Sequence, residues 1–459
     1  MVQVKSRSVK RREFLASVAA FPLLGAGGAR QADLHTADEK VPGNSESPLR
    51  LGLIGIGSRG DELLHEVQQT GQNAFLHAFC DIFDQRLDRA VNRSGGQAKG
   101  YHNYLDLLDD RDIDAVIIAT PDHWHALMAT EAARRGKHIY LEAPMTRSLE
   151  ETRTLKEAVH DSKVVFQLGH QGRQRDLNRK ARELLSQDTL GKISLVETTT
   201  NRNDPEGGWK APEGEQPASE HIDWKVFQGP SGSDQPFSQA RYYGWRNYWD
   251  YGNGMSGELL CNEFDVVNSI LDLGIPESAI ATGGLYFHRD GREVPDVFQA
   301  AFEYPEKALT LLYSGTLASG TPRGILFMGR DASLELGRIL SVWADKKSVK
   351  YRSRIKAGII DPSAPFVHYM QDQDRVDGNS SATSKYYADR GLEYTYREGK
   401  EVHTTRLHLA EWLACIRNGL ACSCNMDRGF EVAVASHMAT RSYLEGRKVN
   451  WDPDNEVII

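Results

Sequence analysis

The stretch "GLIGIGSRGDELL", residues 52–64, constrains the fold most, because it reads as a strand that ends in a glycine turn and resumes as a helix. Its glycines Gly55, Gly57 and Gly60 fit the pattern G-x-G-x-x-G. The run before them is apolar, as in a parallel strand covered on both faces, and Asp61 puts an acid in the first helical turn. A chain with 41 glycines can match this pattern by chance, so the prediction depends on the flanking strand and helix.

A dinucleotide is the expected ligand of this turn. Gly57 lets the backbone approach a pyrophosphate, and Gly60 lets the helix pack closely on the strand. A second strand, "AFLHAFCD", ends at Asp81, about twenty residues after Gly60. A carboxylate there accepts hydrogen bonds from ribose hydroxyls and repels a 2′-phosphate, so NAD is expected rather than NADP. The alternative is an ordinary βα turn that binds nothing. The cofactor-binding residues predicted from this part are Gly55, Gly57, Ser58, Arg59, Gly60 and Asp81.

Length, charge and cysteine content narrow the possible classes of protein. A chain of 459 residues exceeds the size at which one core keeps growing, so two domains are expected. The net charge of -8, without a basic block, argues against nucleic acid as the main partner. No apolar run of about 18 residues follows the N-terminal region, so no membrane span is expected after processing. The five cysteines, without C-x-x-C spacing, predict neither a disulfide framework nor a zinc site.

The N-terminal region carries an expected export signal. Arg11 and Arg12 precede a modest apolar stretch that ends in small residues, which resembles a bacterial twin-arginine signal. We expect residues 1–32 to be this signal, residues 33–48 to be a polar linker, and the protein to be periplasmic or secreted. The basic start of an amphipathic helix is the alternative. A route that exports folded proteins also carries a bound nucleotide across the membrane.

A second pattern follows at residues 112–146, "DIDAVIIATPDHWHALMATEAARRGKHIYLEAPMT". It predicts a buried strand at 114–120, a turn, a helix that Gly136 ends, and a strand at 137–141. With this pattern the chain resembles the family of glucose–fructose oxidoreductase, inositol dehydrogenase and MocA. The matching stretches are "GLIGIGSRG", "ATPDHWHALMA", "GKHIYLEAPMT", "QLGHQGR", "RNYWDYGNG" and "GRKVNWDP".

The resemblance implies an α/β protein of two domains. Family members pair an N-terminal Rossmann domain, a doubly wound parallel sheet, with a C-terminal α/β domain on an open, mostly antiparallel sheet. We place these domains at residues 49–185 and 186–459, the second serving substrate binding and oligomerisation. Five strand-like runs agree with the second sheet: "AIATGGLYFHR", "DVFQAAFEYP", "ALTLLYSGTLAS", "ILFMGRDASLELG" and "LSVWADK". One face of that sheet commonly mediates subunit contacts in the family, so a homodimer or homotetramer is expected.

Two positions depart from the family pattern. The family tripeptide Glu-Lys-Pro, whose lysine helps proton transfer near the nicotinamide, has Ala143 in place of the lysine. The family histidine of a later helical motif is Asn262, between Glu258 and Asp265, and at i, i+4 and i+7 these three are expected on one helix face. An amide orients a hydroxyl by hydrogen bonds but does not take its proton near neutral pH.

His170 is the predicted substitute for the missing base. It lies in "QLGHQGR" after an apolar strand at 164–168, where the family's third core strand meets the substrate cleft, and its ordinary pKa suits acid–base work. A hydrogen-bonded structural histidine is an equally good interpretation. Glu258 and Asp265 are the other candidate bases, unless they bridge to arginines. The predicted catalytic residues are His170, Glu258, Asn262 and Asp265.

The family resemblance implies that the turn after the strand at 114–120 lies against the nicotinamide. His123 and His125 flank Trp124 there, and stacking or ribose contacts are expected of them rather than catalysis. For a metal bound by the two histidines, the sequence offers no further ligand at a telling spacing, so no metal is expected. The predicted cofactor site is completed by Thr120, His123, Trp124, His125 and Glu142.

The segment "RYYGWRNYWDYGNG", residues 241–254, gathers aromatic, arginine and aspartate side chains. Aromatic faces stack on sugar rings, so a carbohydrate cleft is expected, with core or subunit packing as the alternative. The predicted substrate-binding residues are Arg241, Tyr243, Trp245 and Tyr251. Residues 350–400 contain a long polar insertion to which the sequence assigns no role.

Together these expectations favour an exported NAD-dependent oxidoreductase that acts on a hydroxyl of a sugar, glycoside or cyclitol. Some members of the family that the chain resembles cleave glycosides through a transient oxidation, so net hydrolysis or elimination is a second interpretation. A non-catalytic protein that binds NAD or a sugar is the third, because the usual lysine and histidine are Ala143 and Asn262.

Overall fold

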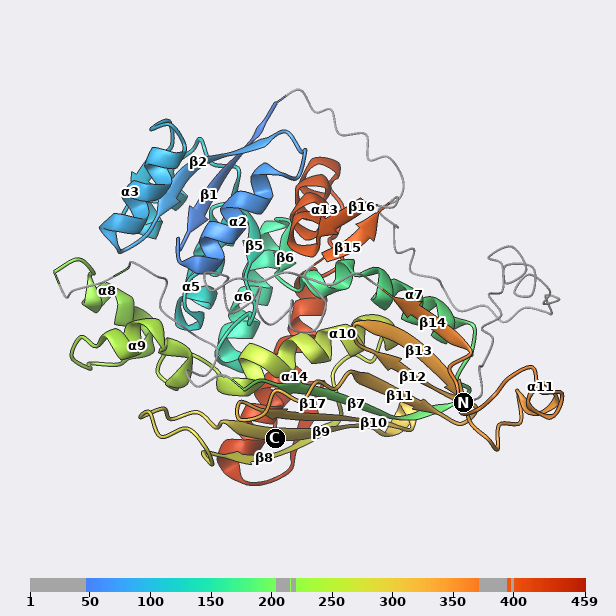
Figure 1. The fold of residues 1–459 in the computed structure, drawn as a ribbon. Coiled ribbons are helices and arrows are strands. Elements are labelled where there is room, and N and C mark those ends of the chain that lie inside the picture. Colours follow the sequence, from blue (N-terminus) through green and yellow to red (C-terminus); the bar gives the residue numbers. More distant parts are fainter. Residues whose placement is uncertain (1–46, 204–214, 216–219, 371–393, 398–399) are drawn as a thin grey trace, which may run out of the picture. The chain divides into compact units, whose positions relative to one another are not determined.

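The computed structural model describes residues 47–203, 215, 220–370, 394–397 and 400–459 (Figure 1). All of them belong to one compact unit of the chain, which begins at Val41. The expected export signal and the linker up to residue 46 lie outside the described residues. Within the described ranges, no helix is both long and apolar enough to cross a membrane.

Six parallel strands form the first sheet, in the order β3-β2-β1-β4-β5-β6. The chain winds outward from β1 in both directions, which is the doubly wound Rossmann order expected from the glycine turn. β4 is buried along its whole length, as a run of Ala-Val-Ile-Ile between two helical layers requires. The strands are β1 (Leu49–Ile54), β2 (Ala74–Cys80), β3 (Lys99–Tyr101), β4 (Ala115–Ile118), β5 (His138–Leu141) and β6 (Phe166–Leu168).

Helices connect these strands. α2 buries Leu63, Leu64 and Val67, which repeat at helical spacing and face the sheet core. α6 begins at Ser148, whose hydroxyl accepts a hydrogen bond from the Glu151 amide and so caps the helix. The helices of this part are α2 (Ser58–Gln68), α3 (Asp84–Arg93), α4 (Tyr104–Asp109), α5 (Asp122–Arg134), α6 (Leu149–Ser162) and α7 (Asp176–Ser186).

Ten strands form the second sheet, in the order β14-β13-β12-β11-β7-β10-β9-β8-β17-β18. Its described strand pairs are antiparallel except β7 with β10, so the sheet is mixed but mostly antiparallel, as expected. The strands are β7 (Ile193–Asn201), β8 (Ser278–Gly284), β9 (Val297–Tyr304), β10 (Leu309–Thr316), β11 (Ile325–Gly329), β12 (Ala332–Leu336), β13 (Ile339–Ala344), β14 (Val367–Met370), β17 (Val449–Asp452) and β18 (Val457–Ile458).

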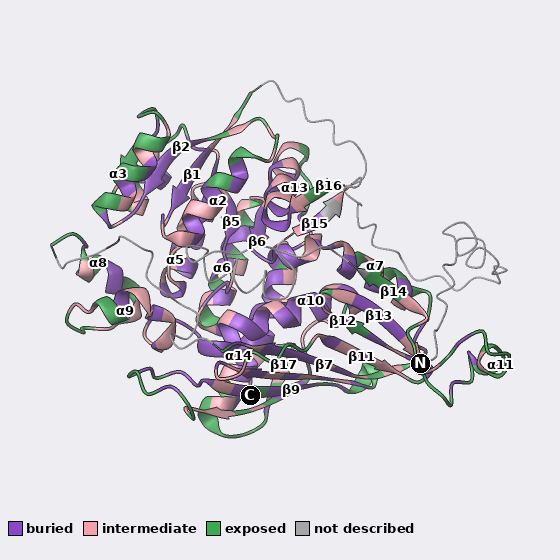
Figure 2. Ribbon diagram, in the orientation of Figure 1, coloured by how far each residue is buried: buried purple, intermediate pink, exposed green. Residues whose placement is uncertain are grey.

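Two helices, α10 (Cys261–Leu271) and α14 (Met426–Glu445), pack on one face of the second sheet, and Figure 2 shows their residues largely buried. The Phe264 ring of α10 lies 5.5 Å from the Phe302 ring of β9, centroid to centroid. Burial alternates along β10, which indicates that the described residues cover only one face of the sheet.

One late helix, α13 (Thr404–Asn418), packs on the first sheet rather than on the second (Figure 1). Its side chains Leu409 and Trp412 are fully buried and belong to the same core cluster as Leu51 of β1. The core of the Rossmann part is therefore completed by residues far along the chain, and the predicted boundary at residue 185 describes chain order rather than packing.

The second sheet contains more strands than the five runs picked out in the sequence. The run "ILFMGRDASLELG" forms the two strands β11 and β12, because Arg330 and Asp331 make a turn in its middle. β7, with its polar Glu-Thr-Thr-Thr half, and the three-residue β3 were not expected at all. Their neighbours in the sheets, rather than their own apolar pattern, favour the extended conformation.

The remaining elements are short. The strands β15 (Tyr394–Arg397) and β16 (Lys400–His403) form a two-stranded sheet, and with α11 and β14 they are the described parts of the polar insertion at 350–400. The others are η1 (Gln171–Gln174), α8 (Trp224–Gln228), η2 (Gly229–Ser231), α9 (Gln239–Tyr243), η3 (Trp245–Asn247), η4 (Ser256–Leu260), η5 (Pro305–Lys307) and α11 (Arg352–Lys356).

Candidate active site

The carboxyl ends of the parallel strands line up along one edge of the first sheet. Ile54 pairs with Cys80 on one side and with Ile118 on the other, and Leu141 pairs with Ile118 and Leu168. In open α/β sheets, ligands bind outside this edge. The residues that directly follow these strands, and so lie along it, are Gly55, Asp81, Ala119, Glu142 and Gly169.

The glycine turn after β1 has the geometry of a dinucleotide-binding turn. Gly55 adopts a φ of 86°, a conformation that side chains rarely allow. A Cβ at Gly60 would lie 2.0 Å from the Gly55 carbonyl oxygen, so the helix approaches the turn too closely for a larger residue. A Cβ at Gly57 would instead have only Nη1 of Arg86 nearby, at 3.4 Å. No side chain caps the N-terminus of α2, so this open side fits a pyrophosphate on the helix N-terminus.

Asp81 is buried directly beside this turn. Its Oδ2 accepts a hydrogen bond from the Ile56 amide at 2.7 Å, and its Oδ1 accepts one from the Phe83 amide at 2.9 Å. Burial raises the pKa of Asp81, while Arg86 and the two backbone amides act in the opposite direction. Each carboxylate oxygen keeps a lone pair, so Asp81 can still accept hydrogen bonds from ribose hydroxyls.

The segment that carries Glu258, Asn262 and Asp265 is not one regular helix. Ser256–Leu260 forms a π-helical turn, and α10 begins only at Cys261. The expected single α-helix is therefore interrupted between Glu258 and Asn262, whereas Asn262 and Asp265 both lie on α10. The three side chains contact different partners.

His170 and Asn262 are brought together from the two halves of the chain. Nδ1 of His170, which follows β6, lies 3.2 Å from Oδ1 of Asn262 on α10. Asn262 in turn donates from Nδ2 to the Glu258 carbonyl oxygen at 3.1 Å, so its amide oxygen faces the imidazole. Nδ1 of His170 is therefore the protonated nitrogen, and Nε2 is left as an acceptor that is buried without a partner among the described residues. Burial lowers the pKa of His170, so the ring is neutral.

Asp265 and Glu258 both bind arginines. The Asp265 carboxylate, 1% exposed, accepts from Nε of Arg173 at 3.0 Å and also from Nη2 of the same guanidinium. Glu258 accepts from Nε of Arg246 at 2.7 Å. Of the two interpretations of these carboxylates, the arginine bridge is the one that the observed contacts favour.

A buried acid that the sequence interpretation overlooked, Asp122, faces Glu258. Asp122 begins α5 and is 1% exposed. Burial and the neighbouring Glu258 carboxylate raise the pKa of Asp122 well above its ordinary range, against the smaller effects of Arg246 and Arg147. Asp122 is therefore the protonated partner, and its hydroxyl donates to Glu258. The only sequence signal for this pair was an acid directly after the Thr-Pro at the end of β4.

The two histidines after β4 are buried and contact the chain itself, whereas Trp124 is partly exposed, and their expected contacts with a cofactor stay a prediction. His123 Nε2 and Trp124 Nε1 both contact the Phe227 carbonyl oxygen, at 2.6 and 3.1 Å. His125 contacts the carbonyl oxygens of Pro144 and Thr120, at 2.7 and 2.9 Å. Burial lowers the pKa of both histidines to about 4, so each is neutral and holds its loop in place.

Arg59 and Glu142 bind each other across the edge of the sheet. Nε and Nη2 of Arg59 lie 3.0 and 2.9 Å from Oε1 of Glu142, and both side chains are buried. A Cβ at Gly169 would lie 3.1 Å from the Glu142 carboxyl group, so the glycine makes room for this ion pair. Two residues predicted to bind the cofactor thus form an ion pair with each other. This pair connects the glycine turn to the end of β5.

Most of the aromatic segment 241–254 is core. Trp245 and Tyr251 are 8% and 0% exposed and belong to a cluster with Phe83 and Phe227. This burial favours the alternative of core packing for the two rings, and their stacking on a sugar stays a prediction. Arg241 and Tyr243 remain partly exposed. Arg241 pairs with Asp250 and Glu293, and the Tyr243 hydroxyl donates to the carbonyl oxygen of Glu215.

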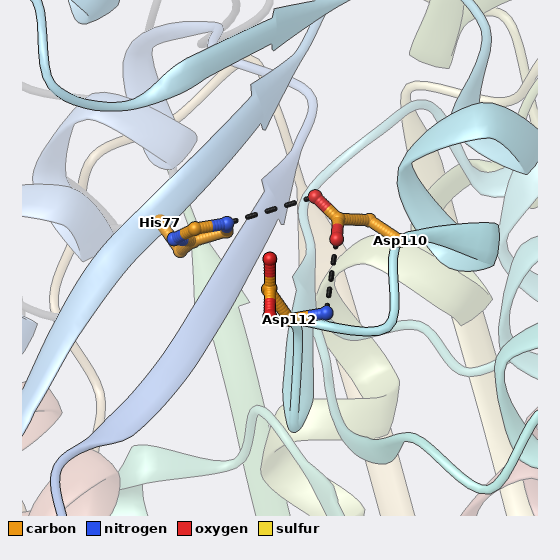
Figure 3. A group of neighbouring side chains, drawn as sticks. All are labelled: His77, Asp110 and Asp112. Carbon is orange, nitrogen blue, oxygen red and sulfur yellow. Dashed lines mark hydrogen bonds and ion pairs between the residues drawn. The ribbon is translucent and has the colours of Figure 1, made fainter.

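One group of side chains in the described part of the chain has the composition of a metal site. Figure 3 shows His77, Asp110 and Asp112 facing one another. Lys99 lies 2.8 Å from Asp110, and Arg50 lies 2.9 Å from Asp112, so cations of the protein already balance these carboxylates. The group belongs to a surface ion-pair network and lies apart from the glycine turn in the sequence. The five cysteines are all free and buried.

Comparison with known families matches both halves of the chain. Residues 49–170 match the model of an oxidoreductase family with an NAD-binding Rossmann fold, and residues 231–451 match the C-terminal α/β domain of the same family.

Curated relatives match parts of the chain. A glycosyl hydrolase family 109 protein of Shewanella sp. (strain ANA-3) is 40% identical over 111 residues, which are 22% of this chain and 24% of that protein. The levoglucosan dehydrogenase of Pseudarthrobacter phenanthrenivorans is 29% identical over 251 residues, or 51% of this chain and 57% of the relative. The chain thus spans about a quarter of the first relative and little more than half of the second.

Solved structures share the fold over most of the chain. Levoglucosan dehydrogenase in complex with NADH and levoglucosan has a TM-score of 0.64 at 17% identity, covering 88% of this chain and 99% of that one. The WlbA dehydrogenase from Bordetella pertussis, in complex with NADH and UDP-GlcNAcA, has a TM-score of 0.61 at 17% identity, with coverages of 88% and 99%. The two family matches establish that the chain belongs to the oxidoreductase family of glucose–fructose oxidoreductase, inositol dehydrogenase and MocA, with an NAD-binding Rossmann domain at its N-terminal end.

Proposed function

We propose that the protein oxidises a hydroxyl group of a sugar, glycoside or cyclitol with NAD as the acceptor. The observation that carries the proposal is the His170–Asn262 pair, because it leaves a neutral imidazole nitrogen as acceptor at the edge where the cofactor turn lies. The sugar-acting names among the relatives agree with this substrate class.

Bound NAD supplies the acceptor for the hydride that leaves the carbon. The chain itself has to take the hydroxyl proton, and we assign this role to Nε2 of His170, which is buried without a hydrogen-bond partner among the described residues. Asn262 holds Nδ1 as the proton-bearing nitrogen, so that Nε2 keeps its lone pair. Because Nε2 is buried, a substrate hydroxyl reaches it only when neighbouring side chains move apart.

Net cleavage of a glycoside is the second candidate function. The stretch that is 40% identical to a glycosyl hydrolase family 109 protein favours it. In such a reaction a transient oxidation is reversed within the catalytic cycle, so the cofactor returns to its starting state. A folded protein that leaves the cytoplasm with NAD bound would need such recycling, since free NAD is scarce outside.

A panel of free sugars, cyclitols and nitrophenyl glycosides tests both functions. An oxidoreductase produces NADH absorbance with a substrate, whereas the cleaving enzyme releases nitrophenol without net NADH. In either case His170→Ala lowers the rate by about a hundredfold, as expected for the loss of general base catalysis. Binding of sugars without turnover, together with activity created by Ala143→Lys and Asn262→His, would identify the protein as non-catalytic.

We also propose that the protein is exported folded by the twin-arginine route and acts in the periplasm or outside the cell. The paired Arg11 and Arg12 support this proposal. Replacing both by lysine is expected to retain the uncut protein in the cytoplasm. Unchanged export of that variant would show that another route is used.

A homodimer or homotetramer is the proposed assembly. Exposed apolar side chains at the second sheet support this assembly, because such side chains mark interaction surfaces. Ile280 of β8 is 51% exposed, and Tyr286 and Phe287, just beyond that strand, are 66% and 59% exposed. Light scattering on the purified protein tests the proposal, and a monomer at all concentrations would contradict it.

A further inference from the structure

The side chain of Arg86 lies beside the cofactor turn, and the proposed function gives this cation no role. Arg86 is in the first turn of α3, the helix that follows β2 after a short turn. Its Nη1 is the atom nearest to a Cβ built at Gly57, at 3.4 Å, and its charge interacts with that of Asp81. The guanidinium lies over the rings of Phe83 and Tyr242, 5.6 and 5.5 Å from their centroids. Arg86 thus borders the place where the adenosine ribose of a dinucleotide is expected.

An arginine at this place is the usual partner of a 2′-phosphate. Its planar fork binds phosphate oxygens in pairs, and Rossmann domains that accept NADP use an arginine near the ribose for this purpose. By this criterion alone, Arg86 favours NADP, whereas Asp81 favours NAD. The two neighbouring residues therefore predict opposite cofactors, and something else has to decide between them.

A carboxylate from beyond the residues that match the Rossmann domain already holds the Arg86 fork. Nε of Arg86 lies 3.1 and 3.0 Å from the two carboxylate oxygens of Glu215, and its Nη2 lies 2.6 Å from Oε2. The Glu215 side chain is only 6% exposed, and Arg89 reaches it at 3.4 Å. The Glu215 carbonyl oxygen also accepts a hydrogen bond from Tyr243. The Nε–Nη2 edge of the guanidinium is therefore occupied, and its charge is balanced.

We propose that Glu215 makes this protein selective for NAD over NADP by occupying Arg86. A 2′-phosphate would have to displace a paired carboxylate and would then lie beside both Glu215 and Asp81, which repel it. The uncharged 2′-hydroxyl of NAD meets neither obstacle. Selectivity is thus shared between a residue of the Rossmann domain and one that lies beyond the Rossmann family match. This inference rests on the proposed binding of NAD.

The test measures the dissociation constants of NAD⁺ and NADP⁺ by titration calorimetry on the purified full-length protein. Glu215→Gln removes the charge and keeps the shape of the side chain, and Glu215→Ala is a second charge-removing variant. Both are expected to lower the ratio of the NADP⁺ to the NAD⁺ dissociation constant by about tenfold or more, mainly by tighter binding of NADP⁺. Glu220→Gln is the matched control, since Glu220 is an exposed acid nearby in the sequence, and it should leave the ratio unchanged.

The double variant Arg86→Ala with Glu215→Gln decides the mechanism, because the gain in NADP⁺ affinity needs the released guanidinium and should vanish. The inference would be overturned if both Glu215 variants had the same ratio of dissociation constants as Glu220→Gln. It would also be overturned if the gain in NADP⁺ affinity persisted in the double variant without Arg86. If the unmodified protein bound neither nucleotide, the proposed function would fail instead, so the two failures are distinguishable.

Discussion

Asn262 holds the imidazole of His170 in one tautomer. Oδ1 of Asn262 lies 3.2 Å from Nδ1 of His170, and Nδ2 of Asn262 is committed to the Glu258 carbonyl oxygen at 3.1 Å, so the amide cannot turn over without losing that bond. The residue that replaces the family histidine therefore acts on a second histidine, one that the sequence places after β6. This arrangement makes Asn262 a positioning residue for His170.

Removing the amide should lower the rate without affecting the cofactor. Asn262→Leu leaves Nδ1 of His170 without an acceptor, so we expect kcat to fall by about tenfold while the dissociation constant of NAD⁺ stays unchanged. Asn262→Asp keeps an acceptor and adds a charge that raises the pKa of His170, so it should restore the rate and move the acid limb of the pH profile upward. Equal kcat in the Leu variant and the unmodified protein would exclude the positioning role.

The pH dependence of the reaction reports on His170 directly. A general base has to be unprotonated, so activity is lost as the pH falls through the folded-state pKa of His170. Burial lowers this pKa below its ordinary value of 6.5, with Arg173 acting in the same direction and Asp265 opposing it. We therefore expect the acid limb of kcat/KM to lie below pH 6.5. A midpoint above that value would point to a different base.

The protonated acid Asp122 makes stability depend on pH. Its folded-state pKa is raised, so the folded protein holds this proton more tightly than the unfolded chain. The stability that this proton supplies is present at low pH and is lost as the pH rises from about 4 towards the folded-state pKa, by about 1.4 kcal/mol per pH unit. Asp122→Asn has no proton to lose, so its stability relative to the unmodified protein should increase with pH over that range. Urea unfolding at several pH values measures the difference, and a constant difference would contradict the account.

The buried pair of Arg173 and Asp265 should be structural. Arg173→Met leaves a buried carboxylate without its cation and should reduce the free energy of unfolding by about 3–5 kcal/mol. Arg173→Met combined with Asp265→Leu removes both charges and should recover much of the loss. Denaturant unfolding measures these two variants and the single variant Asp265→Leu. A double variant as unstable as the sum of the two single variants would show that the two residues do not act as a pair.

The fold was largely predictable because its elements are encoded locally. The apolar runs before Gly55 and Thr120 form β1 and β4, and the positive φ of Gly55 follows from the turn that the glycine pattern implies. Strands without such a pattern, such as Ile193–Asn201, are stabilised by neighbouring strands in the sheet. Their own residues therefore do not predict them. α13 returns to the first sheet because of apolar contacts that no local pattern reveals.

The candidate site was predictable only in part. His170 was identified from its place after an apolar strand, but its contact with Asn262 joins residues that are distant in the chain. The assumption of a regular helix failed at the π-helical turn of Ser256–Leu260, for which the residues give no warning. Aromatic side chains such as Tyr251 suit a sugar cleft and a core equally well, and only the observed burial favours the core.

The central claim is that a neutral His170 takes the proton of a sugar hydroxyl while NAD is reduced. The most direct measurement is a single-turnover experiment in which the unmodified protein and His170→Ala, both with NAD⁺ bound, are mixed with a substrate from the sugar panel while NADH absorbance is followed. The account predicts a transient or lasting NADH signal in the unmodified protein, formed about a hundredfold more slowly in the variant, with equal NAD⁺ affinity in both. An NADH signal that forms equally fast without His170 would contradict it.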